Sequence, residues 1–262
     1  MYPNGYYNYL KCRKNGTTKR KEKIKKAILS IYHKHRGVYG YRIIRKLLEK
    51  EGITISAGTC RKYMNIELGL KSVSRRRNPA YRRGNPHRLF PNLLKQDFCA
   101  DKPNEKWCSD FTYLPISDGS MRYNYTIIDL YDRSVVASVT GNEMSSSLAI
   151  RALSKGISNN RIAKGQLILH SDQGSQFTSK EFVSFCERHS ICQSMSKAGC
   201  PYDNAPMERY FNTLKNEYFN LFSFKDEKIL YDSIEWFSYI WYNHGRPHLV
   251  NGYLTAFEAR YK

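Results

Sequence analysis

The sequence lacks any long apolar run, and its cysteines lack partners at short spacing. No stretch of about 18 consecutive apolar residues occurs, so no membrane span is expected. The seven cysteines include no Cys-x-x-Cys pair, which argues against a disulfide framework and fits a reducing cytosol. His33 and His35 have no nearby cysteine pair, so we expect no structural zinc site. The N-terminus also lacks the pattern of a secretory signal, and a cytoplasmic protein is predicted.

Acidic residues are scarce in the first third of the chain. Residues 1–95 hold 25 Lys+Arg and 4 Asp+Glu, a net +21, whereas residues 96–262 hold 18 and 19, a net −1. Self-repulsion on this scale requires a neutralising polyanion, and nucleic acid is the leading partner. An anionic membrane is the alternative, but it favours basic helices with aromatic anchors, and this region has no Trp.

Apolar spacing predicts a small helical domain over residues 21–70, after a loose segment at 1–20. A first helix is predicted over Lys21–His35 and a second over Tyr41–Lys50, each ending near glycines. Ser56 or Thr59 would cap a third helix that ends at Leu68-Gly69. Three short helices with tight turns fit a helix-turn-helix, although any small basic three-helix bundle fits as well.

The strongest basic clusters of this region are candidates for DNA binding. The third helix would be the recognition helix and carries Arg61 and Lys62. Residues 71–100 combine repeated proline with positive charge, which predicts a linker that follows a phosphate backbone. The linker candidates for DNA contact are Arg75, Arg76, Arg77, Arg82 and Arg83.

The alternation of strand-like and helix-like patterns from residue 101 onward predicts an α/β domain. Strand patterns occupy 105–116, 123–130, 134–139, 167–170 and 191–196, and helical patterns occupy 145–157, 179–189, 204–219 and 226–243. This order predicts a mixed five-stranded sheet with helices packed on it.

Three acids stand out by their positions. Asp110 lies inside an apolar strand, Asp172 follows another strand, and Glu208 lies on a helix. A carboxylate among aromatic residues is costly unless it is paired, exposed or bound to a cation, and carboxylate oxygens suit Mg²⁺ or Mn²⁺. Each acid also has an ordinary interpretation as a cap or turn residue. Asp129 and Asp132 are turn candidates of this kind, and Asp129 is the main competitor for a catalytic role.

Three sequence blocks distinguish among these acids by resemblance. WCSDFTYLP, HSDQGSQFTS and GCPYDNAPMERYFNTLKNEY resemble the acidic blocks of the retroviral integrase superfamily, and in particular the insertion sequence 3 family of transposases in its downstream-frame (OrfB) form. Asp172 and Glu208 are separated by 35 residues, as in that family, and Lys215 lies seven positions after Glu208. HRGVYGYRII and LGLKSVSRRR resemble the family's helix-turn-helix, and YNHGRPHLVNGYLTAFEA resembles its C-terminal tail.

The resemblance implies a ribonuclease-H-like integrase core at 101–225, preceded by the helix-turn-helix and followed by an integrase tail at 226–262. It implies that Asp110, Asp172 and Glu208 are catalytic and bind two Mg²⁺ or Mn²⁺ ions, and that water and then a 3′-OH attack DNA. Lys215, Gln173 and Asn204 would contact that DNA.

The resemblance also implies partners. These are the DNA of the element's terminal repeats, target DNA, further protomers on DNA, and an upstream-frame protein as fusion partner, in a bacterial nucleoid setting. A metal-dependent nuclease without strand transfer and an inactive DNA-binding remnant are the alternatives.

Several residues near the motifs keep two interpretations. His170 orients a carboxylate or is a satisfied structural histidine. Arg246 and His248 contact DNA or close the tail against the core. Asp203 and Asn204 belong to a loop that would close on DNA and then cap the following helix, or one of them is simply the N-cap of that helix.

Overall fold

The computed structural model describes residues 3–73, 89–160, 162 and 165–262. The chain forms two compact units, Met1–Arg75 and Arg76–Lys262. Within the described ranges, no helix is both long enough and apolar enough to cross a membrane. Arg75, Arg76, Arg77, Arg82 and Arg83 lie outside the described residues, so their DNA contacts stay a prediction.

The N-terminal unit is all-helical. It contains α1 (Pro3–Lys34), α2 (Tyr41–Lys50), α3 (Ala57–Arg61) and the π-helical turn η1 (Lys62–Glu67). One apolar stripe of α1 packs against the other helices, as its spacing predicts. The buried members of this core include Ile24, Ile28, Ile31, Ile44, Leu48, Cys60 and Met64.

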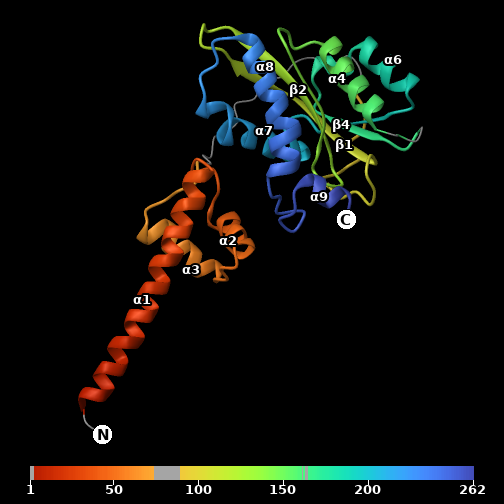
Figure 1. Ribbon diagram of the computed structural model, residues 1–262. Coiled ribbons are helices and arrows are strands. Elements are labelled where there is room, and N and C mark those ends of the chain that lie inside the picture. The colour runs from red at the N-terminus through yellow and green to blue at the C-terminus, as the bar shows by residue number, and fades with distance from the viewer. Residues whose placement is uncertain (1–2, 74–88, 161, 163–164) are drawn as a thin grey trace. The chain divides into compact units, whose positions relative to one another are not determined.

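The first helix is longer than its sequence pattern predicts. The pattern indicates a loose segment at residues 1–20, but α1 begins at Pro3 and continues without a break to Lys34 (Figure 1). Proline is well tolerated at a first helical position, where its missing N–H has no helical partner. Gly5 and Gly16 each cost only about 1 kcal/mol relative to alanine, which is too little to end a helix of many good helix formers.

The predicted third helix forms as α3 followed directly by η1, and contacts fix the start of α3 and the end of η1. Ser56 Oγ caps it by accepting the Thr59 backbone N–H at 3.1 Å. Beyond η1 the chain turns at Gly69, whose φ of +66° suits glycine. Glu67 pairs with Lys21 and Lys25 of α1 at 2.8 and 2.9 Å, so the end of η1 is fixed to the first helix.

The second unit is built on a mixed five-stranded sheet, which confirms the predicted fold class. The strands are β1 (Lys106–Pro115), β2 (Met121–Asp129), β3 (Val135–Gly141), β4 (Ile168–Ser171) and β5 (Cys192–Met195). Their order is β3-β2-β1-β4-β5. The β1–β2 and β2–β3 pairs are antiparallel, and β1–β4 and β4–β5 are parallel.

Helices cover both faces of this sheet (Figure 1). On one face, α4 (Ser146–Asn159), α5 (Ser175–Thr178) and α6 (Lys180–Arg188) enclose an apolar core that includes the fully buried Trp107. On the other, α7 (Ala205–Glu217), α8 (Glu227–Glu235) and the π-helix η4 (Trp236–Gly245) enclose a second core. The short elements η2 (Pro201–Asn204), η3 (Phe219–Leu221) and α9 (Ala256–Arg260) complete the unit.

The end of the expected linker is part of this second unit. Leu94 is buried in the core beneath α7. The Pro91 carbonyl accepts the backbone N–H of Met195 at 3.2 Å, and Leu93 N–H donates to Ser194 Oγ at 2.9 Å. The predicted linker of 71–100 therefore extends too far, because its last residues pack against β5.

The C-terminal segment closes against the same core. Arg246 makes a two-pronged ion pair with Glu217 of α7, with both N–O distances 2.8 Å. His248 is buried, and its Nε2 lies 3.1 Å from the Tyr242 carbonyl. Of the two interpretations of Arg246 and His248, this geometry favours closure of the tail.

Candidate active site

Strand register brings Asp110 and Asp172 together. In the parallel β1–β4 pair, Trp107 lies opposite Leu169 and Cys108 opposite His170. Two residues further along the chain in each case are Asp110, which lies inside β1, and Asp172, which directly follows β4. The carboxyl ends of adjacent parallel strands meet at one edge of a sheet, where α/β proteins place their ligands. The two aspartates thus share that edge although 61 residues separate them in the sequence.

The electrostatics of these two carboxyls reflect their closeness. Burial, and then the neighbouring Asp172 carboxylate, raise the pKa of Asp110 well above its usual value. Burial also raises the pKa of Asp172, against the opposing effect of a hydrogen bond from Gly174 N–H at 2.9 Å. Two partly desolvated like charges at one place are unfavourable unless a cation or a proton offsets them.

Glu208 lies on the first turn of α7, and its side chain is exposed. The opposite side of the helix is anchored by Met207, Tyr210 and Leu214, all fully buried. Among the described residues, no three Asp, Glu, His or Cys side chains lie close enough together to hold one metal ion. The structure therefore pairs two of the three predicted acids and leaves Glu208 in solvent.

The donor set fits a hard divalent cation. Asp110 and Asp172 supply carboxylate oxygens, which Mg²⁺ and Mn²⁺ prefer. A cation would offset the burial that raises the pKa of both groups and the charge of Asp172 that raises the pKa of Asp110 further. Mg²⁺ commonly binds through one or two carboxylates and substrate phosphates, so two aspartates suffice as a starting site.

Lys215 lies two helical turns beyond Glu208 on α7, as its spacing predicts. Its charge lowers the pKa of Asp110, so the ammonium group belongs to the electrostatic environment of the aspartate pair. A cation there would also attract a phosphate group.

The competing acids have structural roles. Asp132 accepts from Arg260 Nη1 at 2.6 Å and from Ser134 N–H at 2.8 Å. Asp129 contacts the same guanidinium at 3.3 Å and accepts the Asn104 backbone N–H at 2.8 Å. Both aspartates are fully buried within this network. The network joins the C-terminal α9 to the turn after β2 and explains both acids without catalysis.

The side-chain amides of Gln173 and Asn204, which are predicted to bind DNA, donate hydrogen bonds to backbone carbonyls within the protein. Gln173 Nε2 donates to the Ser196 carbonyl at 3.0 Å. Asn204 is buried, and its Nδ2 donates to the Ser109 carbonyl at 3.3 Å. DNA contact by Asn204 stays a prediction that requires this side chain to leave Ser109.

His170 and Asp203 have structural partners as well. His170 is fully buried, with Nδ1 2.8 Å from Ser194 Oγ and Nε2 3.1 Å from Ser196 Oγ. Both ring nitrogens therefore have partners, which favours the interpretation of His170 as a structural histidine. Asp203 is not a helix cap, because its carboxylate binds two side chains of residues 89–98. No local pattern signals that contact, since more than 100 residues intervene.

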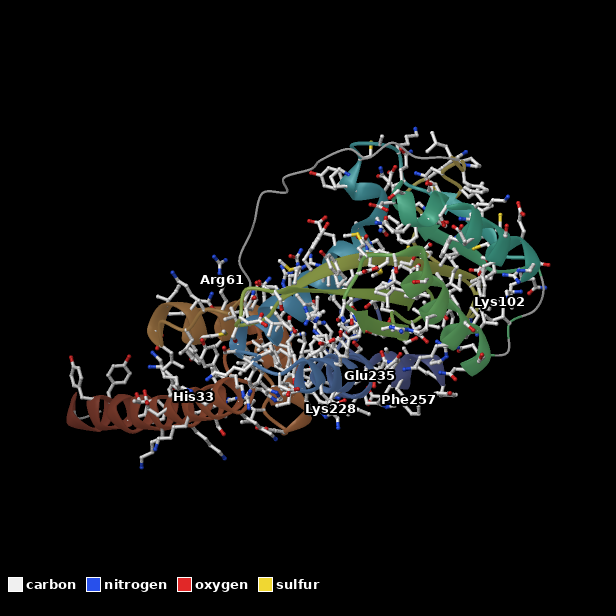
Figure 2. The ribbon with its side chains drawn as sticks, turned by 90° about the horizontal axis from the view of Figure 1, so that it is seen from above. His33, Arg61, Lys102, Lys228, Glu235 and Phe257 are labelled. Atoms are coloured by element: carbon white, nitrogen blue, oxygen red, sulfur yellow. The ribbon has the colours of Figure 1, made fainter. Side chains whose placement is uncertain are left out.

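The predicted recognition residues lie on the surface of the N-terminal unit. Arg61 ends α3 and Lys62 begins η1, and both are exposed. Figure 2 labels Arg61 on the helical N-terminal unit. Exposure makes both side chains available to phosphate or base edges.

Family comparisons agree with both units. Residues 19–78 match the HTH-like domain, and residues 100–201 and 189–255 match the integrase core domain.

Curated relatives match nearly the whole chain. The chain is 34% identical over 236 residues to the transposase for insertion sequence element IS904 of Lactococcus lactis, covering 87% of this chain and 91% of that protein. It is 32% identical over 261 residues to the 31 kDa protein of insertion element IS600 of Shigella sonnei, covering 98% and 94%. It is 30% identical over 255 residues to transposase InsF for insertion sequence IS3A of Escherichia coli, covering 96% and 87%.

A solved structure shares the fold. A chain of the simian T-cell lymphotropic virus intasome superposes with a TM-score of 0.52 at 18% identity, covering 83% of this chain and 70% of that one. The mixed sheet with helices on both faces is thus the ribonuclease-H-like arrangement of integrase cores. With an HTH-like domain ahead of that core and relatives of this identity along its length, the chain belongs to the insertion sequence 3 family of transposases.

Proposed function

We propose that this transposase is a metal-dependent polynucleotidyl transferase that cuts the ends of its insertion element and joins them to target DNA. The observation that carries the proposal is the pairing of Asp110 with Asp172 at one sheet edge, with Glu208 on the adjacent helix. Two carboxyls with raised pKa values, beside a cationic Lys215, suit a site for a divalent cation and a phosphate.

The proposed chemistry has two steps at one site. In the first, water adds to the phosphorus of a phosphodiester at the element's end, the P–O3′ bond breaks, and the 3′ oxygen leaves with a proton. In the second, that 3′-OH adds to a phosphorus of target DNA and displaces another 3′ oxygen. No covalent bond to a protein side chain is formed.

Asp110 and Asp172 would hold Mg²⁺ or Mn²⁺, and Glu208 would join them when DNA is bound. A bound divalent cation supplies charge stabilisation and acidifies a coordinated water, and a pair of ions serves the attacking and leaving oxygens together. Lys215 would bind a phosphate of the substrate, which orients the scissile bond.

The N-terminal unit would hold the element's terminal repeats. Arg61 and Lys62 are the exposed candidates for the helix-turn-helix contact, and the basic excess of residues 1–95 would add sequence-independent affinity. Joining two ends requires more than one protomer, so a multimer on DNA is proposed, with an upstream-frame protein as a fusion partner.

The decisive experiment compares wild type with Asp110→Asn on labelled element-end DNA in Mg²⁺. Wild type should cleave the end, and pre-cut ends should give strand-transfer products. Asp110→Asn removes one cation-binding charge at the same size, so both reactions should fall at least about a thousandfold, within the range that metal and charge stabilisation contribute.

Binding of the same DNA by Asp110→Asn should be unchanged, because the N-terminal unit is intact. Cleavage without strand transfer would favour the nuclease alternative. Undiminished Mg²⁺-dependent cleavage by the variant would contradict the proposed mechanism, and an inert wild type would favour the DNA-binding remnant.

A further inference from the structure

Asp203 is a buried carboxylate with an unusual set of donors. Its Oδ2 accepts from Asn92 Nδ2 and from the Lys197 backbone N–H, both at 2.9 Å, and its Oδ1 accepts from Gln96 Nε2 at 2.8 Å. Only 3% of Asp203 is exposed. We call these four residues the Asp203 clamp. It joins the segment that enters the second unit to the loop that precedes α7.

The donor segment of the clamp is itself fixed in place. Asn92 Oδ1 accepts the Lys95 N–H at 2.9 Å, which closes a tight turn. Lys95 and Gln96 are both left-handed, with φ of 48° and 67°. Non-glycine residues adopt this conformation at an energetic cost and keep it only where surrounding contacts require it. The turn directs Gln96 at Asp203.

The clamp is not a helix cap. The N-cap position of α7 is Asn204, and α7 has no side-chain cap hydrogen bond. The bonds of Asp203 run backward, to Lys197 in its own loop and to Asn92 and Gln96. Its bonding therefore fixes where the loop ends and where α7 begins.

The next residues lead directly to the aspartate pair. Asn204, adjacent to Asp203, donates to the Ser109 carbonyl, and Ser109 precedes Asp110. Glu208 follows on the first turn of α7. The start of the helix is thus tied to the Asp203 clamp on one side and to β1 on the other.

We propose that Asp203 is a positioning residue, and that the Asp203 clamp fixes the backbone of the first turn of α7, from which the Glu208 side chain would join Asp110 and Asp172 when DNA is bound. Rates of phosphoryl transfer depend steeply on such placement, because a displacement of about 1 Å can cost a hundredfold. This inference rests on the proposed function, since it assigns Asp203 a part in the same site.

The test uses the full chain and three variants. Asp203→Asn keeps the size of the side chain but leaves one acceptor oxygen for the three donors Asn92 Nδ2, Gln96 Nε2 and Lys197 N–H. Asp203→Asn combined with Asn92→Asp reverses one donor–acceptor pair and restores it. Gln166→Ala is the control, because it removes an exposed hydrogen bond from Lys102 at 2.9 Å elsewhere in the unit.

Two readouts are measured on each variant. The first is single-turnover cleavage of element-end DNA in Mg²⁺, which separates the rate constant from the half-saturating DNA concentration. The second is amide hydrogen exchange of residues 197–208, which needs neither metal nor DNA.

For Asp203→Asn we expect a rate constant about tenfold to a hundredfold lower, a half-saturating DNA concentration within about twofold of wild type, and faster exchange in 197–204. The reversed pair should recover only part of the rate and the protection, because the Lys197 N–H, which shares Oδ2 with Asn92 in the wild type, then faces an amide donor. Gln166→Ala should match wild type in both.

A wild-type rate constant in folded Asp203→Asn would overturn the proposal, as would an effect on DNA affinity alone. If Asp203→Asn does not fold, the double variant Asn92→Ala/Gln96→Ala replaces it, because it retains the hydrogen bond from Lys197 N–H to Asp203. The same lower rate constant and faster exchange are expected, and a wild-type rate constant would overturn the proposal. Absence of cleavage by wild type would refute the proposed function instead, and unchanged exchange in 197–204 would still refute the Asp203 clamp.

Discussion

At the scale of single residues, chemical type and surroundings separate the acids of the sheet. Burial raises the pKa of both Asp110 and Asp172, and the charge of Asp172 raises the pKa of Asp110 further. Asp129 and Asp132 share Arg260. Asp129 and Asp132 are structural because the Arg260 guanidinium already balances their charge. Within the described residues, Asp110 and Asp172 share no such ion pair with an arginine, so their site suits a metal cation.

Two buried histidines are expected to make the stability of the second unit depend on pH. Burial, and then the charge of Arg246, lower the pKa of His248 to about 4. Burial likewise lowers the pKa of His170 to about 4. The unfolded chain binds these protons first, near the ordinary pKa of about 6.5, so stability is present above that pH and is lost as the pH falls toward 4.

We expect the unfolding free energy to fall by about 2 kcal/mol for each histidine between about pH 7.5 and pH 5. Denaturant unfolding at both pH values measures the slope. His248→Gln keeps a donor for the Tyr242 carbonyl and should remove the contribution of this histidine, about 2 kcal/mol between the two pH values. The pKa of Asp129, raised by burial to about 6, opposes the histidines equally in wild type and variant, so the difference between the two proteins is the quantity to compare. An identical slope in this variant would mean that His248 does not contribute.

At the scale of elements, α7 is the helix on which the site depends. The sheet-facing side of α7 is buried, its first turn carries Glu208, and its last turn is fixed to the tail by the Glu217–Arg246 ion pair. The pair is only 12–14% exposed, so breaking it by removing one partner leaves a poorly solvated charge.

Arg246→Ala should therefore destabilise the unit by about 3 kcal/mol, near the lower limit for a broken buried pair. Thermal or denaturant unfolding measures the effect, and a cycle with Glu217→Gln isolates the coupling between the two charges. The matched control is Glu235→Gln, which breaks the exposed pair with Lys155 at 3.0 Å and should cost less than about 1 kcal/mol. Equal effects of Arg246→Ala and Glu235→Gln would refute the role assigned to the tail.

At the scale of the whole molecule, the features proposed for DNA binding and for chemistry lie in different units. The basic excess lies in the first third, while the paired aspartates lie in the second unit. Residues from 89 onward belong to the second unit, because Leu94 is in its core and Asn92 is in the Asp203 clamp. A deletion that separates the functions must therefore end before them.

Removal of residues 1–75 should leave the second unit folded and weaken binding to element-end DNA. The salt dependence should also become shallower, by close to one unit of log–log slope for each DNA phosphate that the shortened chain no longer neutralises. Titrations at several salt concentrations measure both quantities, and circular dichroism checks the fold. Unchanged affinity and slope would show that the N-terminal unit is not the DNA-binding part.

The sequence by itself determined what local pattern and composition control. Apolar periodicity placed the strands and most helices. The charge split predicted that the first third binds a polyanion, and the resemblance of three blocks, with their spacing, singled out Asp110, Asp172 and Glu208 as the predicted catalytic acids. Local patterns misjudged the start of α1, because isolated glycines do not outweigh a long run of helix formers.

Only the tertiary structure decided which distant groups meet. Arg260 reaches Asp132 across 128 positions, and Asn92 reaches Asp203 across 111. Such contacts follow from strand order and helix packing, and no periodicity within one segment encodes them. The register of the parallel strands β1 and β4 brings Asp110 beside Asp172. Packing of the buried side chains of α7 fixes the helix that carries Glu208.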